Sequence, residues 1–148
     1  MVRLSKKTEY ALMVVQYMAV RPHVQISAKD LARRLELPPA LMAKVVQALV
    51  KGQILTSVMG AGGGYRFKRG TTDVSVADVI EAVEGQQGSL VDCQEPNHDG
   101  CDKQVTCTIR EPLAILNEQI LTTLKTMTVA DLVRPQRTIA RTVQLEVP

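Results

Sequence analysis

The chain has 148 residues, of which 45% are hydrophobic, 22% charged and 3% aromatic. This size and composition fit one compact globular domain or a small domain with an extension, and they exclude a membrane-spanning protein. The net charge of +3 hides an asymmetry, because residues 1–70 hold 12 Lys/Arg and 3 Asp/Glu whereas residues 71–148 hold 6 and 12. A basic half joined to an acidic half predicts a module that binds a polyanion; two solvated faces that bind nothing are the alternative.

Three helices are expected in the first third of the chain. A helix at about 6–19 precedes a second one that begins at Ser27, whose hydroxyl can cap it. The Pro38-Pro39 pair then forces an extended step before a third helix, which ends at Lys51. Two helices joined by so brief a turn are typical of a helix-turn-helix.

A β-hairpin is expected next. Residues 54–58 have strand composition, residues 60–64 are glycine with one alanine, and residues 65–68 alternate aromatic with basic side chains. Three helices followed by a hairpin form a winged helix, whose third helix enters the major groove while the wing tip contacts the phosphate backbone or the minor groove. A nucleotide-binding P-loop is excluded, because no Gly-Lys-Ser/Thr follows the glycines.

The third helix presents a small polar surface in this interpretation. Its inward face is predicted to carry Leu41, Val45, Ala48 and Leu49. The remaining side chains face outward, where the polar ones can reach base edges and phosphates. This outward set comprises Ala40, Ala43, Lys44, Gln47 and Lys51.

All three cysteines, Cys93, Cys101 and Cys107, fall in one acidic loop between two helical patterns. No apolar periodicity would bury these sulfurs, so ligation or reactivity is favoured over a core role. Seven and five residues separate them, a wider spacing than structural zinc usually takes, and an odd number argues against a disulfide framework. Thiolates are preferred ligands of iron-sulfur clusters, which need four ligands, so a carboxylate, an imidazole or a partner chain would complete the set.

Other features bear on the compartment and on rival functions. The chain opens without an apolar signal segment, which predicts a cytoplasmic protein. It contains no Cys-x-x-Cys and no Ser/His/Asp arrangement, so an enzyme is disfavoured. A zinc-bound or cluster-free winged helix that responds through its thiols is the alternative to an iron-sulfur protein.

A longer helix is expected from Ile109 onward, and its narrow apolar seam favours packing against a second copy of the chain. Packing wholly against its own domain is the alternative. The predicted organisation is a winged-helix DNA-binding domain (1–75), a helix and cysteine loop (76–108), a dimerisation helix with a short capped turn (109–133) and a flexible tail (134–148). The fold class is therefore mainly α with a small β-hairpin wing. The seam consists of Leu113, Leu116, Ile120, Leu124 and Met127.

Several short motifs together resemble the Rrf2 superfamily of bacterial winged-helix regulators over about residues 2–133. The resemblance implies a homodimeric, cytoplasmic transcription regulator, a repressor at an inverted-repeat operator. Such a protein uses a bound 2Fe-2S or 4Fe-4S cluster to report iron-sulfur supply, redox stress or nitric oxide. The motifs are Arg3-Leu4-Ser5, Tyr10-Ala11-Leu12, Gly60-Ala61-Gly62-Gly63-Gly64-Tyr65, the three cysteines and Thr128-Val129-Ala130-Asp131-Leu132.

The fourth cluster ligand depends on which branch of the superfamily is followed. IscR-like proteins take a histidine three residues after the last cysteine, where this chain has Arg110. NsrR-like proteins use a carboxylate on the first helix of the partner subunit, and the aligned position here is Glu9. The resemblance thus implies Glu9 of the partner subunit as the fourth ligand, with His98 as the runner-up.

DNA contacts are assigned on the same basis, with two departures. Met59 stands where the family often has arginine before the wing glycines, and Ala43 replaces a residue that IscR-like proteins use to select between operator types. Basic side chains outside the third helix are plausible phosphate contacts, each one about as plausible as a plain solubilising charge. The predicted DNA-binding residues are Arg3, Ser5, Lys6, Lys29, Pro39, Ala40, Ala43, Lys44, Gln47, Lys51, Met59, Gly60, Gly62, Gly63 and Arg66.

Overall fold

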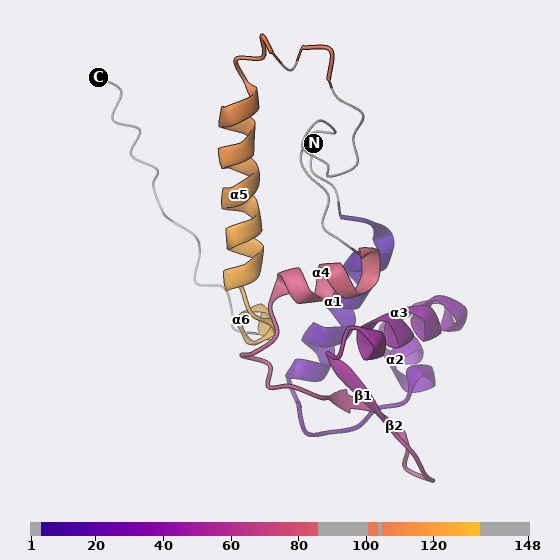
Figure 1. Ribbon diagram of the computed structural model, residues 1–148. Coiled ribbons are helices and arrows are strands. Elements are labelled where there is room, and N and C mark those ends of the chain that lie inside the picture. Colours follow the sequence, from indigo (N-terminus) through magenta and orange to yellow (C-terminus); the bar gives the residue numbers. More distant parts are fainter. Residues whose placement is uncertain (1–3, 86–100, 104, 134–148) are drawn as a thin grey trace.

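The computed structural model describes residues 4–85, 101–103 and 105–133 (Figure 1). Three helices come first, a two-stranded antiparallel hairpin follows, and three further helices complete the described chain. This order confirms the predicted fold class, mainly α with a β-hairpin wing. The elements are α1 (Lys6–Ala19), α2 (Ala28–Arg34), α3 (Pro39–Lys51), β1 (Leu55–Val58), β2 (Gly64–Phe67), α4 (Val76–Glu84), α5 (Arg110–Thr126) and α6 (Val129–Val133).

Local side-chain caps start two of these helices, and the first of them, at Ser27, is expected from the sequence. Ser27 precedes α2, and its hydroxyl accepts a hydrogen bond from the Asp30 amide at 3.1 Å. Ser75 and Asp78 form a reciprocal capping box at the start of α4, with both bonds at 3.0 Å. Each cap satisfies amide groups that have no partner inside the helix, so these helices begin at defined residues.

One hydrophobic core unites α1, α2, α3 and β1 with α4 and α6. Because α4 and α6 pack on α1, the core continues past the predicted domain boundary at residue 75. After α5 the chain returns to the core, where two backbone hydrogen bonds hold it. The Val129 amide donates to the Val74 carbonyl and the Val76 amide donates to the Met127 carbonyl, both at 2.8 Å. The buried core residues are Ala11, Val14, Val15, Met18, Leu31, Ala32, Met42, Val45, Val46, Leu49, Ile54, Leu55, Val74, Val79, Val83 and Val129.

The buried face of α3 is rotated from the predicted one. Val45 and Leu49 are fully buried as expected, but the other two buried positions are Met42 and Val46. Leu41 and Ala48 lie only half-buried at the margins of the stripe. The prediction of Leu41 as an inward residue is wrong, whereas Ala48 packs against the core although it is only partly buried. Positions 42, 45, 46 and 49 form the fully buried stripe, with the i, i+3, i+4, i+7 spacing of one helix face.

The wing is anchored to the segment between α1 and α2. Within the hairpin, Leu55 pairs with Phe67 and Val58 with Gly64. Ile26 adds an isolated bridge to Tyr65, with amide-to-carbonyl bonds of 3.0 and 2.8 Å in the two directions. The hairpin therefore has a third short partner, which ties the tip side of β2 to the segment that leads into α2.

Helix α5 stands apart from the core, and its C-terminal end lies beside the start of α4 (Figure 1). None of its residues is buried within the chain. Ile115 is 52% exposed and Leu116 is 45% exposed, so apolar side chains of this helix face solvent in a single copy.

Candidate functional site

The exposed face of α3 lies opposite its buried stripe. Among the residues predicted to contact DNA, Pro39, Ala40, Lys44, Gln47 and Lys51 are exposed and Ala43 is half-buried. Pro39 occupies the first turn, where its missing amide costs no hydrogen bond. The helix therefore presents small side chains at its start and polar or basic side chains along its length, a surface that fits the width of a major groove.

The wing tip carries an exposed apolar side chain beside glycine. Met59 is 93% exposed, and Gly60 has a φ of +112°, a conformation that side chains disfavour. The turn is closed by a bond of 2.9 Å from the Gly63 amide to the Gly60 carbonyl. Arg66 on β2 and Lys29 on α2 are also exposed, so both predicted phosphate contacts are available to solvent.

Two predicted site residues at the start of α1 pair with each other. The Lys6 ammonium lies 2.6 Å from the Glu9 carboxylate, one turn along the helix. The hydrogen bond and the charge of Glu9 raise the pKa of Lys6 above its ordinary value. The Glu9 side chain is half-exposed, so it is available at the surface. Arg3, a further predicted contact, lies outside the described residues.

Ser5 joins α1 to the end of α4. Its oxygen accepts a bond of 3.2 Å from the Thr8 amide, which caps α1, and its hydroxyl donates to the carboxylate of Glu84. Thr8, fully buried, donates to the same carboxylate oxygen. The Ser5 hydroxyl, followed by that of Thr8, holds the pKa of Glu84 below its usual range. These hydrogen bonds stabilise the carboxylate form and fix α4 against α1.

The cysteine segment is described only in its second half. Cys101 and Cys107 are half-buried free thiols in the turns that lead into α5. Cys93 and His98 lie outside the described residues. Within the described ranges 4–85, 101–103 and 105–133, no three His, Cys, Asp or Glu side chains gather closely enough to hold a metal ion.

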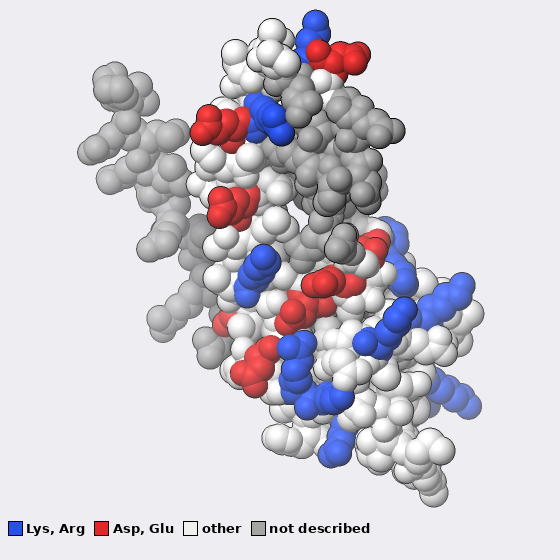
Figure 2. All heavy atoms as spheres, viewed as in Figure 1, with Lys and Arg blue, Asp and Glu red and all other residues white. Residues whose placement is uncertain are grey.

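Charge is divided over the surface as the sequence predicted. Figure 2 shows Lys and Arg gathered over the winged-helix part of the molecule and Asp and Glu along α4, while α5 carries side chains of both signs. A basic winged-helix part and an acidic α4 thus occupy different regions of the same face, which suits attraction of a polyanion to the winged-helix part.

Sequence reasoning missed a cavity between the end of α1, the start of α2 and the wing. Tyr17, Arg21 and Arg34 line it together with the wing residues 61–63. No local spacing connects these positions, because they come from three separate elements. It also missed the Glu84 contact, for which a carboxylate at the end of a helix gives no recognisable signal.

Comparison with known proteins agrees with the geometry. The chain matches the family model Rrf2, described as iron-dependent transcriptional regulator, over residues 4–135. It is 33% identical over 132 residues to the HTH-type transcriptional regulator BadM of Rhodopseudomonas palustris, covering 89% of this chain and 81% of that protein.

Solved structures show the same fold at lower identity. CymR of B. subtilis, titled the global cysteine regulator, superposes with a TM-score of 0.73 at 22% identity, covering 90% of this chain and 97% of that one. IscR of T. potens gives a TM-score of 0.69 at 22% identity, covering 89% and 86%. No helix in the described part of the chain is long and apolar enough to cross a bilayer. The chain therefore belongs to the Rrf2 family and is a DNA-binding, winged-helix transcription regulator rather than an enzyme.

Proposed function

We propose that this regulator is a cytoplasmic homodimeric repressor that binds an inverted-repeat operator and senses redox stress, nitric oxide or iron-sulfur supply through an iron-sulfur cluster. The observation that supports DNA binding is the exposed face of α3. Lys44, Gln47 and Lys51 are exposed on this helix. In the proposed complex Gln47 and Lys44 reach base edges in the major groove and Lys51 meets phosphate. The wing residues 59–63 and Arg66 contact the adjoining backbone.

In this proposal, α5 forms the contact between the two copies of the chain. A helix with no buried residue in its own chain and with half-exposed leucine and isoleucine side chains gains apolar burial from a partner helix. A two-fold axis through two such helices places two α3 helices on one side of the duplex, which matches an operator made of inverted half-sites.

The cluster ligands proposed are Cys93, Cys101, Cys107 and Glu9 of the partner subunit, with His98 as the alternative fourth ligand. The two described thiols fit this role, because they are free, only half-buried and separated by a short turn segment rather than packed in a core. Thiolate donors are those that iron-sulfur clusters require. A bound cluster would supply chemistry that oxidants and nitric oxide can attack.

The chain's own contacts offer a route between the cysteine segment and the DNA-binding surface. The segment begins directly after α4, whose last residue Glu84 is hydrogen-bonded to Ser5 and Thr8 of α1. The same helix also packs on α3, where Ala82 of α4 lies against Gly52 at the end of α3. A shift of α4 therefore changes the support of the helix that meets DNA.

Anaerobic purification with absorption spectroscopy and iron counting tests the cofactor. The wild-type protein is expected to be coloured and to contain iron, and Cys101→Ala is expected to lose both while keeping its helical circular dichroism. Thr108→Ala, an exposed position in the same segment, is the matched control. Operator affinity on DNA selected by the purified protein should depend on the cluster in wild type and not in Cys101→Ala. A colourless, iron-free wild-type protein contradicts the proposal.

A cluster-free or zinc-bound thiol regulator is the second candidate. The observation that favours it is that Cys101 and Cys107 are accessible thiols without a third donor among the described residues. Metal analysis separates the two: zinc at one ion per chain, or no metal together with operator binding that changes on thiol oxidation, supports this candidate instead.

A further inference from the structure

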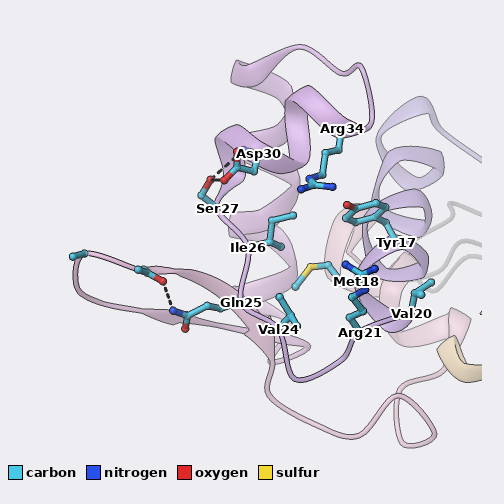
Figure 3. A pocket seen from close by; sticks show the side chains of 13 residues that line it. Tyr17, Met18, Val20, Arg21, Val24, Gln25, Ile26, Ser27, Asp30 and Arg34 are labelled. Atoms are coloured by element: carbon cyan, nitrogen blue, oxygen red, sulfur yellow. Dashed lines mark hydrogen bonds between the residues drawn. The ribbon is translucent and has the colours of Figure 1, made fainter.

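A cavity of about 650 Å³ lies between the C-terminal end of α1, the α1–α2 connection, α2 and the wing (Figure 3). This volume falls in the range of small-molecule sites in proteins, roughly 300–1,000 Å³. The cavity is independent of the cysteine segment, and every residue that lines it is described by the structure.

Part of the lining is apolar. Met18 is buried beneath the cavity and Ile26 is half-buried beside it. Val20 and Val24 are 62% and 56% exposed, so their side chains reach the solvent at its edge. An apolar ligand group placed here would be removed from water together with these side chains, and that burial favours binding.

The other part of the lining is basic. In Figure 3 the guanidinium groups of Arg21 and Arg34 both point toward the Tyr17 ring, one from each side. Neither group has a hydrogen-bond or ion-pair partner among the residues that the structure describes. The one acidic side chain of the cavity, Asp30, is already engaged, because it accepts bonds of 2.8 Å from Arg33 and from the Ser27 hydroxyl.

Two cations that face one cavity without an anion repel each other weakly and attract a negative group. A guanidinium presents a planar fork of donors that matches a carboxylate. We propose that this cavity binds a small organic monocarboxylate with an apolar body. Its carboxylate lies between Arg21 and Arg34, and its apolar part lies against Met18, Val24 and Ile26.

The site adjoins the wing, which gives a ligand a way to act on DNA binding. Gln25, in the α1–α2 connection, donates a hydrogen bond from its side-chain amide to the Gly62 carbonyl of the wing, and both residues line the cavity. The wing backbone at 61–63 forms one wall. The proposal goes beyond the cluster-sensing function and assigns the protein a second input, whose binding is measured in the absence of DNA and of metal.

The test uses octanoate as the probe and the full-length protein. We expect octanoate to shift the methyl resonances of Met18, Val24 and Ile26 in a saturable manner, and octan-1-ol, which has the same chain without the charge, to bind at least about ten-fold more weakly. The double variant Arg21→Gln/Arg34→Gln should lose at least about ten-fold in octanoate affinity. Lys29→Gln is the matched control, since this exposed cation is on α2 and does not line the cavity.

A second variant keeps the test independent of the arginines. Val24→Glu places a negative charge at the exposed edge of the cavity and should also weaken octanoate binding, with unchanged circular dichroism. Equal binding of octanoate and octanol, or equal affinity of the double variant and wild type, overturns the proposal. DNA phosphate is the rival anion. If octanoate leaves the methyl resonances unmoved while the double variant weakens DNA binding and flattens its salt dependence, the arginines contact the duplex and the proposal fails.

Discussion

The buried hydroxyl of Thr8 donates a hydrogen bond to the carboxylate of Glu84, and this bond joins the first turn of α1 to the last residue of α4. Ser5 donates to the same oxygen, and the Lys7 ammonium donates to the Val83 carbonyl at 3.0 Å. The helix that leads into the cysteine segment is thus held to the helix that supports the DNA-binding module.

The Glu84 contact predicts a pH-dependent stability. Because the hydroxyls lower the pKa of Glu84 in the folded protein, its contribution to the free energy of unfolding is complete above the ordinary pKa of about 4.3 and is lost as the pH falls through the lower, folded value. The difference in unfolding free energy between wild type and Glu84→Gln should therefore shrink between about pH 6 and about pH 3 in urea titrations.

Glu81→Gln is the control for this experiment, since Glu81 is exposed on the same helix. Its difference from wild type should vary less over the same pH range. A Glu84→Gln difference that stays constant with pH would show that the ionised carboxylate gains nothing from the Ser5 and Thr8 hydroxyls.

A close approach between α3 and α4 predicts a steric defect. A Cβ added at Gly52 would lie 2.4 Å from the Cβ of Ala82, so Gly52→Ala must force the two elements apart. We expect the unfolding free energy to fall by about 1–3 kcal/mol, measured by urea denaturation. Gly52 has a φ of −74°, so backbone strain does not contribute.

The double variant Gly52→Ala/Ala82→Gly removes the clash and provides the control. Ala82→Gly alone should cost about 1 kcal/mol as a glycine within a helix. The double variant should lose less unfolding free energy than the sum of the losses in the two single variants. Additive losses would contradict the packing described between these two residues.

The exposed face of α3 predicts two different effects on DNA binding. Gln47→Ala should lose about 1–3 kcal/mol of discrimination between the operator and altered half-sites, because a base contact is removed. Lys51→Ala should weaken binding to all sequences and reduce the slope of log K against log[salt] by about 1. Lys125→Ala, an exposed lysine on α5, is the charge-matched control. Equal effects of the two lysine variants would argue against α3 as the DNA-binding helix.

The apolar seam of α5 predicts a defined oligomer. Leu116→Glu should dissociate the proposed dimer into monomers in light scattering at micromolar concentration, because a buried charge would replace an apolar contact. Leu116 is 45% exposed within the chain, so the variant should keep its fold. Thr122→Glu, at an exposed position on the opposite side of the helix, should remain dimeric. A wild-type monomer would refute the proposed role of α5.

Local sequence was enough to locate the elements. The caps at Ser27 and Ser75 involve side chains and amides three residues apart, so they are readable from spacing. The wing follows from strand-forming residues on either side of glycines, one of which, Gly60, adopts a left-handed φ. In the site, the exposure of Lys44 and Gln47 also followed from helical periodicity. These features depend on contacts within a few residues along the chain.

Tertiary packing decided the rest. The rotation of α3 that buries Met42 and Val46 depends on which helices surround it. Helical periodicity predicts that one face is buried, but it does not fix how that face is turned toward the core. Thr8 and Glu84 are 76 residues apart, and no short-range pattern pairs them. Likewise, the arginines that face the cavity come from different segments, Arg21 from the α1–α2 connection and Arg34 from α2. Side chains distant in sequence interact only after the core brings their elements together, so this chain's local patterns determined its elements, and its fold determined their contacts.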